Sequence, residues 1–258
     1  MLRLRNALWA TAVTLVTISF GARADTITIV ADEWCPYNCS PDSDRPGYMI
    51  EIASKALGVA GHTIKYSTMP WSRAIEEARR GKYTAIVGAA RNDAPDFVFP
   101  DEPLGISGSV FAVKKGSTWK YTGIDSLATV SIGVIQDYSY AEDLDAYIAK
   151  YAKDAKRVQA ATGETALGTN IRKLEAGRID ALVEDRAVLE YELAEEGKLG
   201  QFDYAGTLKQ SEVFIAFSPA HPAAKEYARL LAEGVRALRA SGELDTILAR
   251  YGLKDWKR

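Results

Sequence analysis

Two carboxylates come at the end of an apolar stretch in the second half of the chain. Ile179 to Val183 predict a buried strand, and Glu184 and Asp185 follow it directly. Open α/β sheets bind ligands at the carboxyl ends of their strands. We therefore expect Asp185 to contact a ligand, with Glu184 in its place if the register differs by one residue. The competing interpretation is that Asp185 caps a helix beginning near Ala187, because Asp is a favoured N-cap residue.

Three aromatic residues, Trp34, Tyr37 and Trp71, lie in or beside predicted loops at strand ends. An aromatic face stabilises an organic cation by roughly 0.5–2 kcal/mol. We expect these side chains to line a pocket. The alternative is ordinary core packing, which is the more frequent use of large aromatic residues.

Two arginines are candidate binding groups for an anion. Arg91 follows the predicted strand Tyr83 to Gly88 closely, and Arg73 lies in a predicted helix. The planar guanidinium group can hold a carboxylate through two hydrogen bonds. The alternative for each arginine is a surface salt bridge, which contributes little to stability.

Alternating strand and helix patterns indicate an α/β protein with two halves. The first half has predicted strands at Asp25–Ala31, Thr63–Ser67 and Tyr83–Gly88, and predicted helices at Tyr48–Ala60 and Trp71–Arg80. The second has strands at Val130–Ile135, Lys156–Ala160 and Ile179–Val183, and helices at Ala141–Ala152, Glu164–Ala176 and Ala187–Glu196. Extended connectors are predicted near Ser107–Val113 and Ser211–Phe217, and Pro219–Tyr251 is mostly helical with a break at Ser241-Gly242. Two halves and two connectors predict a cleft that closes about a hinge.

The first 24 residues have the features of a cleavable export signal. Arg3 and Arg5 precede an apolar run from Ala7 to Phe20, and Ala22-Arg23-Ala24 fits a cleavage site. This run is shorter than the roughly 20 residues that span a bilayer, although an uncleaved anchor is the alternative. Loss of the signal removes three arginines and changes the net charge from −2 to −5. That acidity argues against nucleic acid as a partner.

The two cysteines, Cys35 and Cys39, are separated by Pro36, Tyr37 and Asn38. An exported protein meets an oxidising environment, so we expect a disulfide, with two free thiols as the alternative. The spacing differs from that of a CxxC redox motif. Metal binding would require more ligands nearby, and the two histidines are far away in sequence, so we expect no metal site.

Five segments in order resemble the family 3 extracellular solute-binding proteins, the periplasmic receptors of polar amino acid ABC importers. They are I-V-A-D-E-W-C-P-Y, P-G-Y-M-I-E-I-A, P-W-S-R-A-I-E-E-A-R-R-G-K-Y-T-A-I, L-E-A-G-R-I-D-A-L-V-E-D and S-G-E-L-D-T-I-L-A-R-Y-G. The similarity runs from about Thr26 to the C-terminus. It implies a two-lobed type II binding-protein fold, with lobe 1 at 25–109, lobe 2 at 110–212 and a return to lobe 1 at 213–258.

The resemblance also implies a function without a cofactor. A monomer in the periplasm would close on one small polar solute and deliver it to an ABC permease in the inner membrane. In such proteins an Asp at the position of Asp185 binds the ammonium group of an amino acid, and an aromatic residue at the position of Trp34 packs on the ligand.

Two loops depart from the family pattern. A T-x-x-R loop normally binds the ligand carboxylate, whereas this chain has R-N-D-A-P-D-F-V-F-P, with Arg91 earlier and the Thr missing. A small-residue turn in lobe 2 is replaced by Gln136-Asp137-Tyr138-Ser139-Tyr140. Tyr138 and Ser139 can donate hydrogen bonds to a ligand, but Asp137 would repel a carboxylate. Asp137 and Asp185 together favour a cationic or amine-bearing solute.

Two other functions fit the same scaffold. One is a dehydratase that uses Glu184, Asp185 or Asp137 as an acid or base, although the sequence contains no nucleophile–base motif or catalytic metal set. The other is a periplasmic sensor that docks on a membrane signalling receptor instead of an importer.

Overall fold

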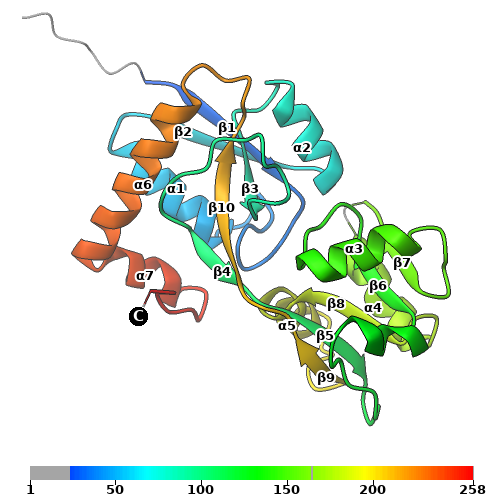
Figure 1. Cartoon of the computed structure of the whole chain (residues 1–258). Helices are drawn as coiled ribbons and strands as arrows, with labels where there is room; N and C mark the ends of the chain where they lie inside the picture. The colour runs from blue at the N-terminus through cyan, green and yellow to red at the C-terminus, as the bar shows by residue number, and fades with distance from the viewer. Residues whose placement is uncertain (1–23, 164, 258) are drawn as a thin grey trace, which may run out of the picture.

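The computed structural model describes residues 24–163 and 165–257, so the predicted export signal lies outside the described residues except for Ala24. In this part of the chain no helix has both the length and the apolar character needed to cross a membrane. Two five-stranded sheets with flanking helices form two lobes, as Figure 1 shows. The predicted α/β class and two-lobed architecture are therefore confirmed.

Lobe 1 is built on a sheet with the strand order β2-β1-β3-β10-β4. Its strands are β1 (Thr26–Ala31), β2 (Thr63–Thr68), β3 (Ala85–Ala89), β4 (Gly105–Ser107) and β10 (Ser211–Phe217). Its helices are α1 (Tyr48–Gly58), α2 (Trp71–Arg79), α6 (Ala224–Ser241) and α7 (Glu243–Ala249). Strand β1 is parallel to β2 and β3, whereas β10 is antiparallel to β3 and β4. Helices α1 and α6 lie on one side of the sheet and α2 on the other (Figure 1), so both faces are covered, as in parallel sheets generally.

Lobe 2 repeats this plan with the strand order β7-β6-β8-β5-β9. Its strands are β5 (Ser109–Lys114), β6 (Ile132–Ile135), β7 (Val158–Ala161), β8 (Ala181–Asp185) and β9 (Phe202–Thr207). Its helices are α3 (Glu142–Tyr151), α4 (Ala166–Glu175), α5 (Arg186–Glu195) and the short 3-10 helix η1 (Ile124–Thr129). Strand β6 is parallel to β7 and β8, and β5 is antiparallel to β8 and β9.

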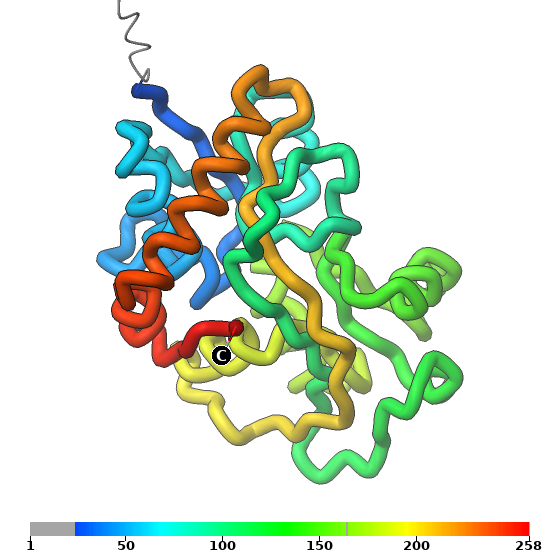
Figure 2. Tube along the Cα trace, turned by 60° about the vertical axis from the view of Figure 1, so that its left-hand side comes forward, coloured from blue at the N-terminus to red at the C-terminus, as the bar shows by residue number. Residues whose placement is uncertain are grey.

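The chain passes between the lobes twice, and the two crossings lie side by side (Figure 2). One crossing is at Gly108, between β4 and β5, and the other is at 208–210, between β9 and β10. The amide of Leu208 donates to the carbonyl of Ser109 at 2.9 Å. A Cβ atom added to Gly108 would lie 3.5 Å from the Gln210 side chain. We call these paired segments the hinge; the predicted lobe limits at 109/110 and 212/213 fall close to it.

Three features differ from the predicted elements. Strand β8 continues through Glu184 and Asp185 because both pair with β5, so these carboxylates end the strand instead of following it. The predicted connector Ser107–Val113 divides at Gly108 into strands of different sheets. Strand β9 and helix η1 were not predicted, since neither has the apolar periodicity used for the other elements.

Candidate functional site

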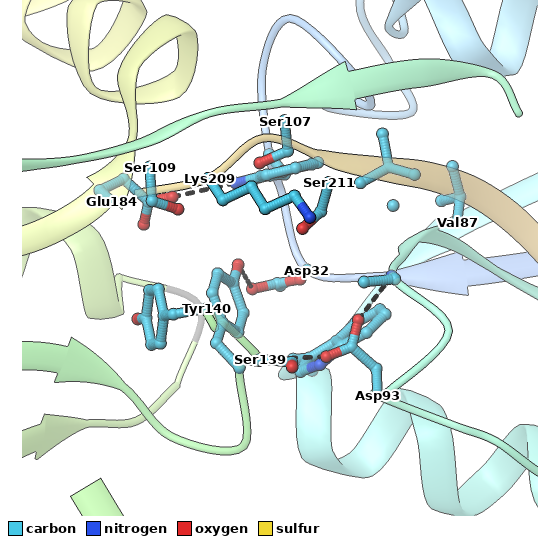
Figure 3. Close-up of a pocket in the computed structure, with 16 residues that line it drawn as sticks. Asp32, Val87, Asp93, Ser107, Ser109, Ser139, Tyr140, Glu184, Lys209 and Ser211 are labelled. Carbon is cyan, nitrogen blue, oxygen red and sulfur yellow. Dashed lines mark hydrogen bonds between the residues drawn. The ribbon is translucent and has the colours of Figure 1, made fainter. Parts of the chain in front are cut away.

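A cavity of about 50 Å³ lies between the lobes, next to the hinge. It is lined by three carboxylates, those of Asp32, Asp93 and Glu184, together with aromatic and hydroxyl side chains (Figure 3). The cavity is larger than the space that one water molecule needs. Hydrogen bonds across the cleft end on all three carboxylates, so the structure is that of the closed protein.

Asp32 is the residue directly after β1, and its side chain points into the cavity (Figure 3). The Asn38 amide donates to the Asp32 carbonyl at 2.7 Å and fixes this loop against the strand end. From the other lobe, the Tyr138 hydroxyl donates to the Asp32 carboxylate at 2.6 Å. Burial raises the pKa of Asp32 to about 6, although this hydrogen bond opposes the increase.

Glu184 approaches the cavity from lobe 2 and is only 1% exposed. Its Oε1 atom accepts from the Trp34 indole at 3.1 Å and from the Asp185 amide at 2.7 Å. Its Oε2 atom is buried and has no hydrogen-bond partner among the described residues. Burial raises the pKa of Glu184 to about 8. A buried acceptor without a partner is costly, so this oxygen is suited to a donor from a ligand.

Asp93 lies in the loop after β3. Together, Asp32, Asp93 and Glu184 form the acidic part of the cavity lining, which we call the acidic wall. Its Oδ2 accepts from the Ala90 amide at 2.6 Å, and its Oδ1 accepts from the Ser139 amide of lobe 2 at 3.0 Å. Burial, with smaller contributions from the charges of Asp145 and Asp32, raises the pKa of Asp93 to about 7. All three carboxylates therefore hold protons more tightly than isolated acids and would be stabilised by a nearby cation.

Two of the three predicted aromatic residues, Trp34 and Trp71, line the cavity. Trp34 lies over the backbone of Gly88, where a Cβ atom would come within 3.2 Å of the indole ring; the φ of 84° at this position also favours glycine. Tyr37 stacks behind Trp34 at a centroid distance of 4.1 Å. Trp71 packs edge-on against Tyr138.

Asp185 is placed as a helix cap that also holds the hinge, outside the cavity lining. Its Oδ1 accepts from the amides of Ala187 and Val188, and its Oδ2 accepts from Gly108 N–H and the Ser107 hydroxyl. The Tyr37 hydroxyl lies 3.2 Å from the same oxygen. Glu184, and not Asp185, lines the cavity. Glu184 therefore occupies the place expected for Asp185, as in the alternative with the register shifted by one residue.

Neither predicted arginine lines the cavity. The Arg91 guanidinium lies 4.6 Å from the centre of the Phe214 ring and 5.1 Å from that of Phe99, and it donates to the Pro100 carbonyl. Arg73 is exposed on α2. In the closed structure neither guanidinium is therefore placed to hold the carboxylate of a solute in the cavity.

The predicted lobe 2 loop reaches the site in part. Tyr138 and Ser139 line the cavity, and the Ser139 hydroxyl donates to Asp145 at 2.9 Å. Asp137 does not line it; this residue has a φ of 62° and accepts from the Ser72 hydroxyl across the cleft at 2.5 Å. Glu184 is the residue that makes the lobe 2 side of the cavity acidic. Asp137, which was expected to do so, makes a contact between the lobes instead.

The expected disulfide between Cys35 and Cys39 is present. It closes a tight loop in which the Trp34 amide donates to the Asn38 carbonyl at 2.7 Å and the Asn38 amide donates back at 3.1 Å. The disulfide therefore holds the segment that presents Asp32 and Trp34. Among the residues described, no group of three or more His, Cys, Asp and Glu side chains is placed to bind a metal ion.

Several cavity residues were missed from the sequence. Asp32 and Asp93 follow β1 and β3, and a carboxylate after a strand is the same signal that indicates Asp185 as a ligand contact. The cavity is also lined by Lys209 of the hinge and by three serines directly beside the hinge, Ser107, Ser109 and Ser211. The sequence pattern that could have identified them is the spacing of two residues within each pair, Ser107 and Ser109, and Lys209 and Ser211. Residues two apart in an extended chain face the same side.

The description of one protein family fits this chain over almost its whole length. The model of the bacterial extracellular solute-binding proteins, family 3, matches residues 27–254. No curated protein sequence matches the chain at a significant level.

Solved structures share the fold at low sequence identity. A mutant of the arginine-binding protein ArgBP from T. maritima is 18% identical, with a TM-score of 0.71 over 89% of this chain and 96% of that one. A chain from work on glutathione import through GshT and the cystine ABC importer TcyBC of Streptococcus mutans is 18% identical, with a TM-score of 0.73 and coverages of 91% and 99%. A histidine kinase sensor domain with similarity to periplasmic binding proteins is 20% identical, with a TM-score of 0.71 and coverages of 88% and 95%.

Proposed function

Because the chain belongs to the bacterial extracellular solute-binding proteins of family 3, we propose that it closes its lobes on one small amine-bearing solute and delivers it to an ABC permease. The choice of an amine-bearing solute rests on the acidic wall of Asp32, Asp93 and Glu184. The buried Oε2 of Glu184 in this wall has no hydrogen-bond partner among the described residues. An ammonium group would donate to this oxygen and supply a counter-charge to the wall.

The surroundings of the acidic wall favour a cation in the cavity. Burial penalises an ionised carboxylate, and an opposite charge within a few ångströms removes that penalty. Trp71 also lines the cavity, and an aromatic ring there adds an attraction for organic cations. The solved structures that share the fold include an arginine-binding protein, which supports an amino acid or a related amine as the solute.

The location and partner follow from the same proposal. The family is described as extracellular, and the predicted export signal favours the periplasm with an inner-membrane permease as partner. We expect the receptor to act as a monomer. The family is one of binding proteins, and no enzymatic activity is part of the proposal. Sensing is the second candidate, because a histidine kinase sensor domain shares the fold.

Calorimetric titration of residues 25–258 tests the proposal. The protein is first unfolded and refolded to remove any solute that copurifies, and is then titrated with amino acids, polyamines and small organic acids. We expect saturable binding of an amine-bearing compound, with a large loss in Glu184→Gln and none in Glu195→Gln, a matched change at an exposed glutamate of α5. Absence of saturable binding throughout the panel, or binding of acids without an amine, would overturn the proposal.

The role in transport needs a separate measurement in cells. Deletion of the gene should reduce uptake of the solute identified by titration, and expression of the wild-type protein should restore it. Unchanged uptake together with a lost transcriptional response to the solute would favour the sensor instead of the importer.

A further inference from the structure

The hinge side of the cavity has a different chemistry from the acidic wall. Lys209 of the hinge and the adjoining Ser109 and Ser211, the first residues of β5 and β10, line one side of the cavity, which we call the hinge wall, and Asp32 and Asp93 lie on the opposite side (Figure 3). Among the described residues that line the cavity, Lys209 is the single cationic side chain. One side of the cavity therefore carries an ammonium group and hydroxyl groups, with Glu184 beside Ser109, and it faces the carboxylates of Asp32 and Asp93.

The backbone of the hinge explains why these three side chains converge. Lys209 and Ser211 are two residues apart in an extended segment, so both face the same side. The amide of Leu208 donates to the carbonyl of Ser109, which places the first crossing beside the second. Side chains from both crossings therefore reach one region of the cavity, although they are about 100 residues apart in sequence.

The polar groups of this wall are available to a ligand. Lys209 makes no ion pair or hydrogen bond with any described residue, and neither do the hydroxyls of Ser109 and Ser211. Lys209 remains exposed to solvent beside the cavity, yet its side chain extends along the cavity toward Ser211 (Figure 3). An ammonium and two hydroxyl groups are suitable donors for a carboxylate.

Neither arginine belongs to the lining of this cavity in the closed protein. Arg91 is held against Phe99 and Phe214, and Arg73 lies outside the cavity lining. A carboxylate near Asp32, Asp93 or Glu184 would be repelled. The part of the hinge wall at the Lys209 ammonium and Ser211, which lies away from Glu184 in Figure 3, is thus the place in the cavity where a negative group can be bound.

On this geometry we propose that Lys209, with the hydroxyls of Ser109 and Ser211, binds the carboxylate of the solute. The solute is then an amino acid whose amine lies at the acidic wall and whose carboxylate lies at the hinge, and not a simple amine. This inference rests on the proposed receptor function and assigns the anion site to the hinge instead of to Arg91.

Paired ligands test the inference by titration of residues 25–258. The panel consists of the protein amino acids and ornithine, each with the amine that remains after removal of its α-carboxyl group. The variants are Lys209→Met, Lys209→Arg and, as a control, Lys120→Met at an exposed lysine of lobe 2. Thermal unfolding of each variant verifies that the fold is retained.

The expected result is that an amino acid binds and its decarboxylated partner binds at least about 10-fold more weakly. Lys209→Met should lower the affinity for the amino acid by about 10- to 100-fold, the effect of one charge-assisted hydrogen bond. Lys209→Arg should retain most of the affinity, and Lys120→Met should match the wild type.

Two other results separate the inference from the proposed function. If a decarboxylated amine binds as tightly as its amino acid, or Lys209→Met leaves the affinity for the amino acid unchanged, the hinge site is wrong and the receptor function stands. If no amino acid and no amine binds to the wild type, the proposed function fails and the inference fails with it.

Discussion

At the scale of single residues, the site depends on carboxylates that the fold buries without a full set of partners. Glu184 is the clearest case, since one of its oxygens is bonded twice and the other has no partner among the described residues. Its pKa of about 8, against an ordinary value of 4.5, means that the empty folded protein binds a proton which the unfolded chain releases. Stability is therefore lost as the pH rises from about 4.5 to about 8.

Glu184→Gln should reverse this loss. The amide oxygen can still accept from Trp34 and Asp185, and the variant has no charge to bury above pH 8. We expect the melting temperature of the empty variant to exceed that of the wild type by roughly 2–6 °C at pH 9, and to lose this advantage at pH 5. The same variant should bind the solute more than about 10-fold more weakly. A melting temperature unaffected by the substitution at pH 9 would contradict the assigned protonation of Glu184.

Solute binding should release protons near neutral pH. In the empty protein Asp93 and Glu184, with pKa values of about 7 and 8, are at least partly protonated at pH 6.5. A bound ammonium group lowers both pKa values, so affinity should rise between pH 5 and pH 8. Calorimetry at pH 6.5 in phosphate and in a buffer with a large ionisation enthalpy should give different heats, corresponding to roughly one proton released. Equal heats in the two buffers would argue against a cation beside these acids.

At the scale of elements, the sequence predicted the parts with strong periodicity and missed those defined by pairing. The buried strand near Ile179 was recognised from its apolar run, but its end was not, because pairing with β5 carries the strand through two carboxylates. That shift exchanges the expected roles of Glu184 and Asp185. It also shows why a one-residue register difference decides which acid reaches the ligand and which caps the helix.

The hinge and the acidic wall illustrate a second limit. Asp32, Asp93 and Lys209 are far apart in sequence, and only the closure of the two lobes brings them to one cavity. Arg91 was expected there from its place after a strand, yet Phe99 and Phe214 hold it outside. Local patterns identify strand ends, whereas the direction of a long side chain depends on packing between distant elements.

The loop after β1 gives a prediction at this scale. The Cys35–Cys39 disulfide closes the segment that presents Trp34 to the cavity. Replacing both cysteines with serine should lower the free energy of unfolding by about 2 kcal/mol, the value expected for so short a loop. Affinity for the solute should fall several-fold because Trp34 loses a fixed position. Urea unfolding and calorimetry measure the two effects, and the reduced wild type serves as a control that should reproduce them. A variant with wild-type affinity would show that backbone hydrogen bonds alone hold this loop.

At the scale of the whole molecule, each cavity carboxylate also takes part in closing the cleft. Asp32 accepts from Tyr138 and Asp93 from the Ser139 amide, both in lobe 2, and Glu184 of lobe 2 accepts from Trp34 of lobe 1. Closure without a solute therefore buries three acids and raises their pKa values, whereas closure around an ammonium group buries them with a counter-charge. The proposed amine-bearing solute would favour the closed state because only that state surrounds its cationic group with all three acids.

The balance between open and closed forms of the empty protein should consequently depend on pH. In the closed form the pKa values of Asp32, Asp93 and Glu184 are about 6, 7 and 8, and opening the cleft hydrates the carboxylates and returns these values toward the ordinary range. The closed form binds more protons, so it is favoured at pH 5 and is progressively lost as the pH rises to 9.

Small-angle X-ray scattering of the empty protein should show the radius of gyration increasing over this range, and saturating solute should abolish the increase. The triple variant Asp32→Asn, Asp93→Asn, Glu184→Gln carries no ionisable group at these positions and should keep one radius from pH 5 to 9. A pH-dependent expansion of the triple variant equal to that of the wild type would mean that other groups control closure.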